Sequence, residues 1–182
     1  YITFISDVMK RVPAEYKGQT EVNGNTVVKT DNGGEGRIYG TEAQLGARLG
    51  LGFSISASLA YTYGVEFQNA EDRAKDPEHR KKVPLSKMPP LFGEAKLRWE
   101  GKAAEKTAAF AETFVLWATR QDRLSDLDKD DVRIPEGGTP GWATWNLRGG
   151  VDINELVRLA LTLENLTNAR YKYHVAGFYS PG

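Results

Sequence analysis

The stretch Phe53-Ser-Ile-Ser-Ala-Ser-Leu-Ala-Tyr-Thr-Tyr-Gly-Val-Glu-Phe67 decides the fold. Its odd positions are all apolar or aromatic, whereas its even positions carry mostly serine, threonine, glycine and glutamate. Side chains of a strand point alternately to opposite faces, so this period of two indicates a β-strand rather than a helix. Soluble strands usually span about 5 to 6 residues, whereas a tilted strand needs about 9 to 11 to cross a bilayer. The stretch therefore predicts a strand long enough to span a membrane.

The composition limits the classes of protein that fit this strand. The 182 residues include 24 basic and 24 acidic side chains and no cysteine. The neutral balance gives no electrostatic sign of nucleic-acid binding, and the absence of cysteine excludes disulfides and thiolate metal sites. No run of about 18 apolar residues predicts a membrane helix, but the strands of a membrane barrel hide their apolar half in the alternation. No signal peptide opens the chain and Tyr1 begins inside a strand-like pattern, so we expect either a fragment or one piece of a larger barrel.

Six further segments show a strand pattern, and their connections alternate between long and short. Strands are expected at residues 1–12, 37–49, 91–100, 107–121, 142–151 and 156–166. Short turns are expected at 50–52, 101–105 and 152–155, and long loops at 13–36, 68–90, 122–141 and 167–182. Long loops at one end of a sheet and short turns at the other are typical of outer-membrane barrels. The facing of 107–121 stays open, because Phe110, Glu112, Phe114 and Leu116 share one parity.

The alternation assigns the side chains of these strands to two faces. We expect a lipid-facing set of Ile55, Leu59, Leu97, Leu159, Leu161 and Leu163. We expect a lumen-facing set of Glu42, Gln44, Arg48, Glu94, Lys96, Arg98, Arg158 and Glu164, since Arg or Lys at the lipid midplane costs about 2–4 kcal/mol. Aromatic girdles are expected from Tyr39, Tyr61, Tyr63, Trp117, Trp142 and Trp145 at the long-loop ends and from Phe53 and Trp99 at the other. A soluble β-barrel binding protein, with its apolar face inward, shows the same alternation and is an alternative.

Several segments resemble the C-terminal barrel of TonB-dependent outer-membrane receptors. The resemblance covers about residues 37–182 and rests on segments 37–42, 83–90, 117–125, 128–131, 133–135, 137–141 and 165–171. The sharpest of these is Asn165-Leu166-Thr167-Asn168-Ala169-Arg170-Tyr171. The resemblance implies an all-β fold, an up-and-down antiparallel transmembrane β-barrel segment of about seven strands from a barrel of about 22.

The same resemblance implies a function in uptake across the cell outer membrane, with the chain as a multi-pass β-barrel. The implied activity is import of a scarce solute (siderophore-iron, haem, cobalamin or oligosaccharide) coupled to the TonB complex. Residues 1–182 would form the C-terminal portion of the barrel, with the plug domain and the final strand absent. The expected partners are outer-membrane lipid, the plug and the remaining strands, from the same polypeptide or from partner chains, and TonB. The alternative is a structural or surface-binding barrel subunit without transport.

Loop residues supply the candidates for ligand binding, namely Arg123, Asp128, Arg133, Tyr171, Tyr173 and His174. The acidic run at 126–131 suggests calcium, but Asp131 and Gly137 stand where an EF-hand needs glycine and glutamate, so a solvated loop is the better interpretation. His79 and His174 have no metal-ligand partner at useful spacing. Glu112 and Glu164 have no nucleophile or oxyanion group converging on them. The sequence therefore predicts no enzyme, no metal site and no cofactor.

Overall fold

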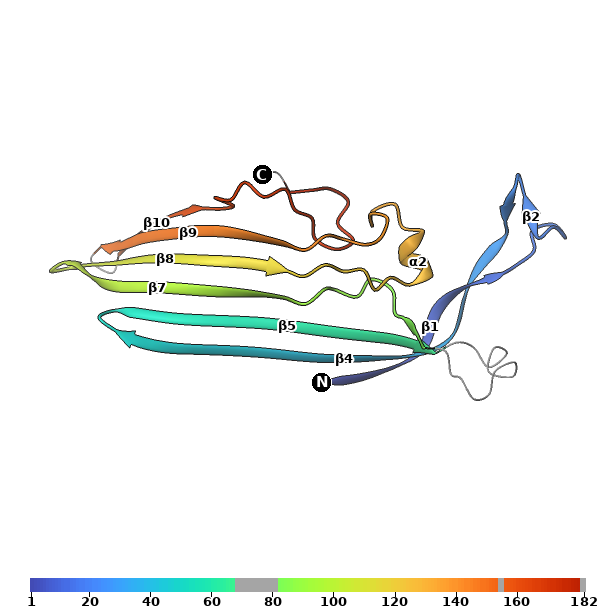
Figure 1. Ribbon diagram of the computed structural model, residues 1–182, viewed down its shortest axis with the longest axis horizontal. Helices are drawn as coiled ribbons and strands as arrows, with labels where there is room; N and C mark the ends of the chain where they lie inside the picture. Colours follow the sequence, from blue (N-terminus) through green and yellow to red (C-terminus); the bar gives the residue numbers. More distant parts are fainter. Residues whose placement is uncertain (68–81, 154–155, 181–182) are drawn as a thin grey trace.

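The computed structural model describes residues 1–67, 82–153 and 156–180, and only the backbone of residues 7–12 and 30–34. These residues form a single large antiparallel sheet with the strand order β1-β4-β5-β7-β8-β9-β10 (Figure 1). Its strands are β1 (Ile2–Pro13), β4 (Val28–Gly50), β5 (Phe53–Phe67), β7 (Phe92–Ala104), β8 (Thr107–Ala118), β9 (Trp142–Ile153) and β10 (Val157–Leu163). The short β6 (Lys82–Pro84) pairs with β5, and β2 (Glu21–Val22) and β3 (Asn25–Thr26) form a separate hairpin. The all-β, up-and-down antiparallel prediction is confirmed.

The connections fall at the two ends of the sheet as expected. The turns from β4 to β5 and from β7 to β8 lie at the left of Figure 1, and the long loops lie at the right. In the first of these turns Gly50, Leu51 and Gly52 have φ of 89°, 52° and 82°, a left-handed backbone that glycine adopts easily. Gly52 also has no room for a Cβ, because the carbonyl oxygen of Glu100 occupies that position. Among the described residues no helix combines the length and the apolar character needed to span a bilayer.

Several predicted boundaries were wrong. β4 begins at Val28, inside the predicted loop 13–36, and the turn-forming residues 31–34 continue the strand because β1 pairs with them across an irregular register. β7 runs on to Ala104, through the predicted turn at 101–105, whereas β8 ends at Ala118 rather than at 121. The loop 122–141 contains a short helix, α2 (Asp126–Lys129). His79, most of the loop 68–90 and positions 154–155 of the last short turn lie outside the described residues.

Strand pairing gives the sheet two chemically distinct faces. On the face that we call the apolar face, one row across the strands consists of Ala47, Ile55, Leu97, Thr113, Leu147 and Leu163. On the charged face the adjoining row consists of Arg48, Ser54, Arg98, Glu112, Arg148 and Thr162. This register settles the open question about β8, because Glu112 pairs with Arg98 and Phe114 with Lys96.

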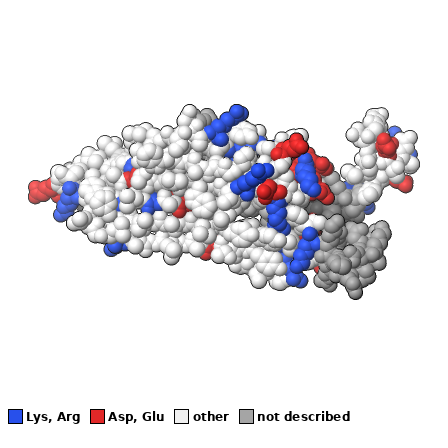
Figure 2. Space-filling view, viewed as in Figure 1, with Lys and Arg blue, Asp and Glu red and all other residues white. Residues whose placement is uncertain are grey.

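On β8 and β9 polar side chains of the charged face are covered, whereas large apolar side chains are exposed on the apolar face, the reverse of a soluble sandwich. The six leucine and isoleucine side chains of the predicted lipid-facing set share the apolar face and are 40–67% exposed. Asn146, Thr144 and Glu112, on the charged face, are 2%, 3% and 6% exposed. In Figure 2 the charged side chains gather at the long-loop end and at the opposite tip, and the surface between them is largely uncharged.

One member of the expected aromatic girdle lies on the other face. Trp117 and Trp145 share the apolar face, where the indole Nε1 of Trp145 donates to Thr113 Oγ1 at 2.6 Å. Trp142 pairs with Ala118, which in turn pairs with Phe92, and all three lie on the charged face. The reason is parity, since Trp142 and Trp145 are an odd number of residues apart on one strand. Trp142 is thereby available to a site inside the long-loop end.

Candidate ligand-binding pocket at the long-loop end

A pocket of about 350 Å³ opens where the long loops meet the ends of β7, β8 and β9. Phe92, Leu116 and Ala118 of β7 and β8 line it, together with Lys172, Tyr173 and His174 of the last loop, 164–180. The full lining is Lys87, Pro89, Pro90, Phe92, Gly93, Leu116, Trp117, Ala118, Thr119, Thr139, Pro140, Trp142, Lys172, Tyr173 and His174. Segments far apart in the sequence therefore build one concave, mostly apolar site, which is the usual form of a small-molecule site.

Aromatic rings form one wall of the pocket. The ring centroid of Trp142 lies 4.4 Å from the ring centroid of Tyr171 and 5.1 Å from that of Tyr173. The ring centroids of the two tyrosines are 5.7 Å apart. The Trp142 and Tyr173 rings meet edge to face, an arrangement that the ring quadrupoles favour. Burial, with the neighbouring Tyr171 and Glu164, raises the pKa of Tyr173.

Two lysines and a histidine are among the residues that line the pocket. Lys87 and Lys172 line the pocket, and Lys172 is only 7% exposed. His174 shares a 2.9 Å hydrogen bond between its Nδ1 and Thr139 Oγ1, while its buried Nε2 has no hydrogen-bond partner among the described residues. Burial lowers the pKa of His174, against the opposing influence of Asp128 and Asp131, so the neutral imidazole is favoured.

Asp128 holds Lys87 in position through a set of hydrogen bonds that we call the Asp128 latch. Its carboxylate accepts from Ser86 Oγ at 2.7 Å, from Lys87 N at 2.9 Å and from Ser125 N at 3.0 Å. Although burial opposes ionisation, these hydrogen bonds lower the pKa of Asp128, which is 1% exposed. Ser125 caps α2 in return, accepting from Asp128 N. Asp128 of the acidic run 126–131 thus joins the loop that contains Ser86 and Lys87 to the loop that contains Ser125.

Two more hydrogen bonds tie the loop 119–141 to its neighbours. Gln121 Nε2 donates to the carbonyl oxygen of Met88 at 2.7 Å. Arg123 Nη2 donates to the carbonyl oxygen of Gly64 at 2.6 Å, and its guanidinium lies 3.7 Å from the centroid of the Tyr63 ring. The rim of the pocket is therefore fastened to the end of β5 and to the segment before β7.

The six residues predicted to bind ligand separate into two groups. Tyr171, Tyr173 and His174 come together at the pocket, where Tyr173 and His174 are lining residues and Tyr171 contacts the ring of Trp142. Arg123 and Asp128 make the contacts between loops described above. Arg133 forms a bidentate ion pair with Asp131 at 2.6 and 2.9 Å, which lowers the pKa of that carboxyl.

Sequence reasoning missed Lys172, Lys87, Phe92 and Trp142 as pocket residues. Lys172 lies between two residues that were predicted, so its place in the chain was a usable signal. Trp142 was detectable from its parity, but it was assigned by its position near the strand end alone. Nothing in the sequence relates Lys87 or Phe92 to the last loop, because the contact depends on how the loops fold over the sheet.

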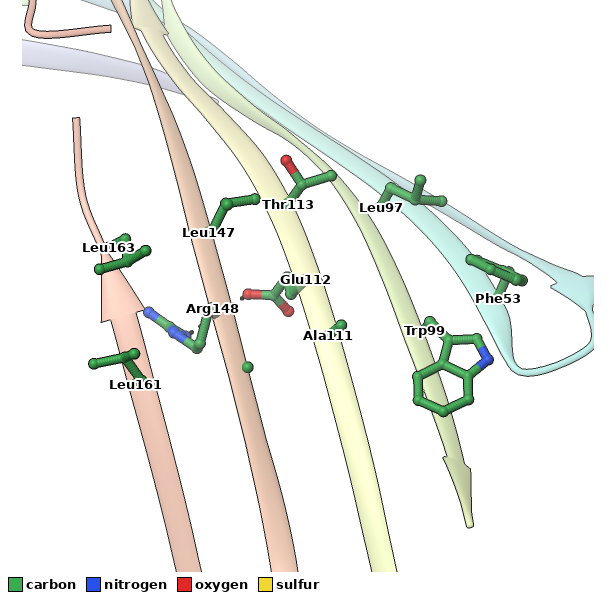
Figure 3. A pocket seen from close by; sticks show the side chains of 11 residues that line it. Phe53, Leu97, Trp99, Ala111, Glu112, Thr113, Leu147, Arg148, Leu161 and Leu163 are labelled. Atoms are coloured by element: carbon green, nitrogen blue, oxygen red, sulfur yellow. Dashed lines mark ion pairs between the residues drawn. The ribbon is translucent and has the colours of Figure 1, made fainter. Parts of the chain in front are cut away.

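A second polar cluster lies further along the charged face, around Glu112. Its carboxylate lies 3.0 Å from Arg98 Nη1, 3.8 Å from Arg148 Nη1 and 3.9 Å from Lys96 Nζ. The Arg98 guanidinium also lies 4.2 Å from the centroid of Phe110. Figure 3 shows Arg148 and Glu112 on the neighbouring strands β9 and β8, joined by an ion pair. The predicted lumen-facing residues Lys96 and Arg98 are thus brought together by a carboxylate that the prediction did not include.

The predicted lumen-facing residues outside this cluster that belong to paired strands lie along the same face. Arg158 pairs with Asp152 across β9 and β10, and Glu42 and Gln44 lie on β4 opposite Ala60 and Ser58. Glu164 follows the last paired residue of β10. In the described stretches of the chain no group of three or more His, Cys, Asp or Glu side chains is arranged to hold a metal ion.

Comparisons with known proteins agree with this architecture. Residues 10–166 match the model of a family described as TonB dependent receptor-like, beta-barrel. A solved structure named "Copper transporter OprC" is similar with a TM-score of 0.64 and 19% sequence identity, over 96% of this chain and 23% of that one. At this identity the likeness shows a shared fold, and the chain spans less than a quarter of that protein. No curated protein matches the sequence.

Proposed function

The chain belongs to the TonB-dependent receptor β-barrel family, and on that premise we propose that it forms a section of the wall of an outer-membrane transport receptor. The family is one of receptors rather than of enzymes. In this proposal residues 1–182 are a C-terminal portion of the barrel, and a plug domain and further strands complete it. The pocket at the long-loop end faces the outside and helps to capture the solute.

The observation that carries the proposal is the exposure of large apolar side chains on the apolar face, with covered polar side chains opposite them on β8 and β9. Leu161 is 67% exposed on the apolar face, whereas Asn146 and Glu112 are covered on the charged face. Apolar side chains that point out of a sheet lose nothing when the solvent is hydrocarbon, and charges are tolerated where they line a polar lumen. We therefore assign the apolar face to lipid and the charged face to the lumen.

The pocket supports a role in solute capture rather than a purely structural one. Aromatic rings from Trp142 and Tyr173 offer large contact area at small entropic cost, as at other recognition sites. The solute classes that we propose are siderophore-iron, haem, cobalamin and oligosaccharide, with import coupled to TonB. Copper joins this list, because the similar solved structure is named a copper transporter.

The test uses the full-length receptor that contains this chain, expressed in cells that lack their own importers. Uptake of labelled ferric siderophores, haemin, cobalamin, oligosaccharides and Cu(II) is measured with and without TonB. We expect one solute to accumulate only when both proteins are present. We also expect Trp142→Ala to raise the half-saturating concentration about tenfold, since loss of an aromatic anchor typically costs more than about 1 kcal/mol.

A matched control replaces Phe178, which is 76% exposed in the same loop and absent from the pocket lining. Phe178→Ala should leave uptake unchanged. Accumulation that is equal with and without TonB, or absent for every solute, would contradict active transport and favour a surface-binding barrel.

A further inference from the structure

A groove of about 520 Å³ lies on the apolar face, toward the end of the sheet that carries the short turns. One wall consists of Phe53, Leu97 and Trp99 of β5 and β7, and the other contains Leu161 and Leu163 of β10 (Figure 3). The surface of the groove is almost entirely apolar. An apolar occupant therefore gains by entering it, whereas a polar one loses its hydration.

Small residues form the floor of the groove between these walls. Ala111 of β8 pairs with Gly149 of β9, and this pair lies between Trp99 of β7 and Leu161 of β10 in one row across the sheet. Neighbouring strands are about 4.8 Å apart, so two strands with almost no side-chain height separate the two walls. The depression therefore runs along β8 and β9.

The polar groups closest to the floor are engaged elsewhere. The hydroxyl of Thr113, in the next row of the floor, accepts from Trp145 Nε1 at 2.6 Å. Glu112 and Arg148 alternate with the floor residues, so their side chains lie on the charged face, where they form an ion pair. The floor therefore remains apolar although these polar residues contribute to it.

The indole of Trp99 closes the groove at the end nearest the β4–β5 turn. A Cβ placed on Gly52 of that turn would lie 3.2 Å from Trp99 Nε1, and one placed on Gly101 would overlap the indole ring. The ring thus lies over Gly101 with its N–H beside the turn. Unlike the N–H of Trp145, it has no hydrogen-bond partner among the described residues. Tryptophan takes this position at membrane interfaces, where the ring is in hydrocarbon and the N–H meets polar groups.

We propose that this groove binds one acyl chain of a phospholipid, with an ester or phosphate oxygen of the same molecule accepting from Trp99 Nε1. The groove is continuous with the lipid-exposed rows of the apolar face, and its one free donor lies where those rows end. A chain on the floor contacts protein beneath it and on both flanks, whereas a chain over a flat part of the face contacts protein on one side. The lipid held here is therefore bound more tightly than its neighbours.

The inference rests on the proposed function for one point, the assignment of the apolar face to lipid. The experiment measures lipid binding to the purified full-length receptor in detergent, by native mass spectrometry. The probe is dipalmitoyl phosphatidylethanolamine, titrated into receptor that has first been stripped of lipid. We expect the first lipid to bind at least about tenfold more tightly than the later ones, as contact with about two additional methylene groups provides.

Two substitutions fill the floor. Ala111→Leu should weaken binding of the first lipid about tenfold, because the larger side chain displaces part of the acyl chain. Gly149→Ala should weaken it less, and the backbone has room for the added methyl group, since the nearest atom, the carbonyl oxygen of Phe110, is 3.6 Å from the new Cβ. Ala57→Leu is the matched control, on the apolar face but outside the groove, and should change nothing.

A third substitution tests the donor at the end of the groove. Trp99→Phe keeps an aromatic ring and removes the N–H, and should weaken the first lipid several-fold. Trp145→Phe removes an N–H that is already bonded to Thr113 and should leave the affinity for lipid unchanged. Heat-modifiable migration on gels shows whether each variant is folded. If Ala111→Leu does not fold, Gly149→Ala and the comparison of the first lipid with later ones still decide the question.

Equal affinities for all lipids would overturn the inference, as would an unchanged first affinity in folded Ala111→Leu and Gly149→Ala. A second copy of the receptor that binds this face in place of lipid, and that Ala111→Leu releases, would also overturn it. Binding is measured without TonB or an energised membrane, so its outcome is independent of transport. TonB-dependent uptake without a tightly bound lipid would sink this inference alone, and a tightly bound lipid without such uptake would sink the proposed transport alone.

Discussion

Replacing Leu59 by arginine tests which solvent the apolar face meets. Leu59 lies in the middle of β5, 40% exposed, opposite Ala43 of β4 and Gly93 of β7. These small neighbours offer the guanidinium neither a counter-charge nor cover, so the arginine faces hydrocarbon if the apolar face is lipid-exposed. The cost is about 2–4 kcal/mol at the midplane. Converted at about 1.4 kcal/mol per factor of ten, the folding equilibrium falls roughly 30- to 700-fold.

The neighbouring residue provides the matched control. Ser58 points to the charged face, between Gln44 of β4 and Glu94 of β7. An arginine at position 58 meets the carboxylate of Glu94, and an exposed ion pair of this kind changes stability by about 0–1 kcal/mol. Ser58→Arg should therefore fold almost as well as the unaltered receptor.

The assay is reversible folding of the full-length receptor into lipid vesicles, followed by denaturant titration and by heat-modifiable migration on gels. The expected result is a large loss for Leu59→Arg and little or none for Ser58→Arg. Equal losses, or a larger loss for Ser58→Arg, would refute the assignment of the apolar face to lipid.

Three further changes address the charged face and the loops. Glu112→Gln should destabilise the barrel by about 1–3 kcal/mol in denaturant titration, because the cations around it lose a buried partner, whereas Glu100→Gln, at a side chain 62% exposed, should cost much less. Asp128→Asn replaces an accepting oxygen by a donor and should speed proteolysis within residues 119–141, whereas Asp126→Asn, at a side chain 93% exposed, should leave it unchanged. Burial lowers the pKa of His174 in the folded protein below its ordinary value near 6.5. The contribution of His174 to docking of the last loop is therefore fully present above pH 6.5 and is lost as the pH falls through the lowered pKa. Hydrogen exchange in residues 167–180 should rise over that range, and His174→Asn should remove the dependence on pH.

The strands were predictable from sequence wherever apolar and polar residues alternate strictly, so that each face of the strand has one character. The bounds of β5 were predicted without error, because fifteen residues alternate strictly and glycine-rich or polar segments flank them. The facing of β8 was not predictable, since Phe110 and Phe114 share parity with Glu112 and resemble lipid-facing residues. Only the pairing with β7 and β9 reveals that these rings lie beside Arg98 and Arg148 on the charged face.

The prediction from local turn residues was wrong where pairing with a distant strand determines the backbone conformation. Residues 31–34 carry the asparagine and glycine pattern of a turn, but hydrogen bonds from β1 keep them extended within β4. The pocket was half predictable, since the aromatic last loop is conspicuous in the sequence. The opposite rim of the pocket, at Lys87, was not predictable. Lys87 is held there by a hydrogen bond from its backbone N–H to the carboxylate of Asp128, 41 positions away, and no local sequence pattern encodes that contact.

The Asp128 latch has a consequence for how the outer rim moves. Ser86 and Lys87 belong to one loop and Ser125 to another, yet a single carboxylate satisfies all three, and Gln121 adds a bond to Met88. If either loop moved away alone, the hydrogen-bonding groups of the other loop would lose their partners. The amides of residues 82–91 and 119–141 should therefore share a single opening free energy, as one cooperative unit that is already shaped before any solute arrives.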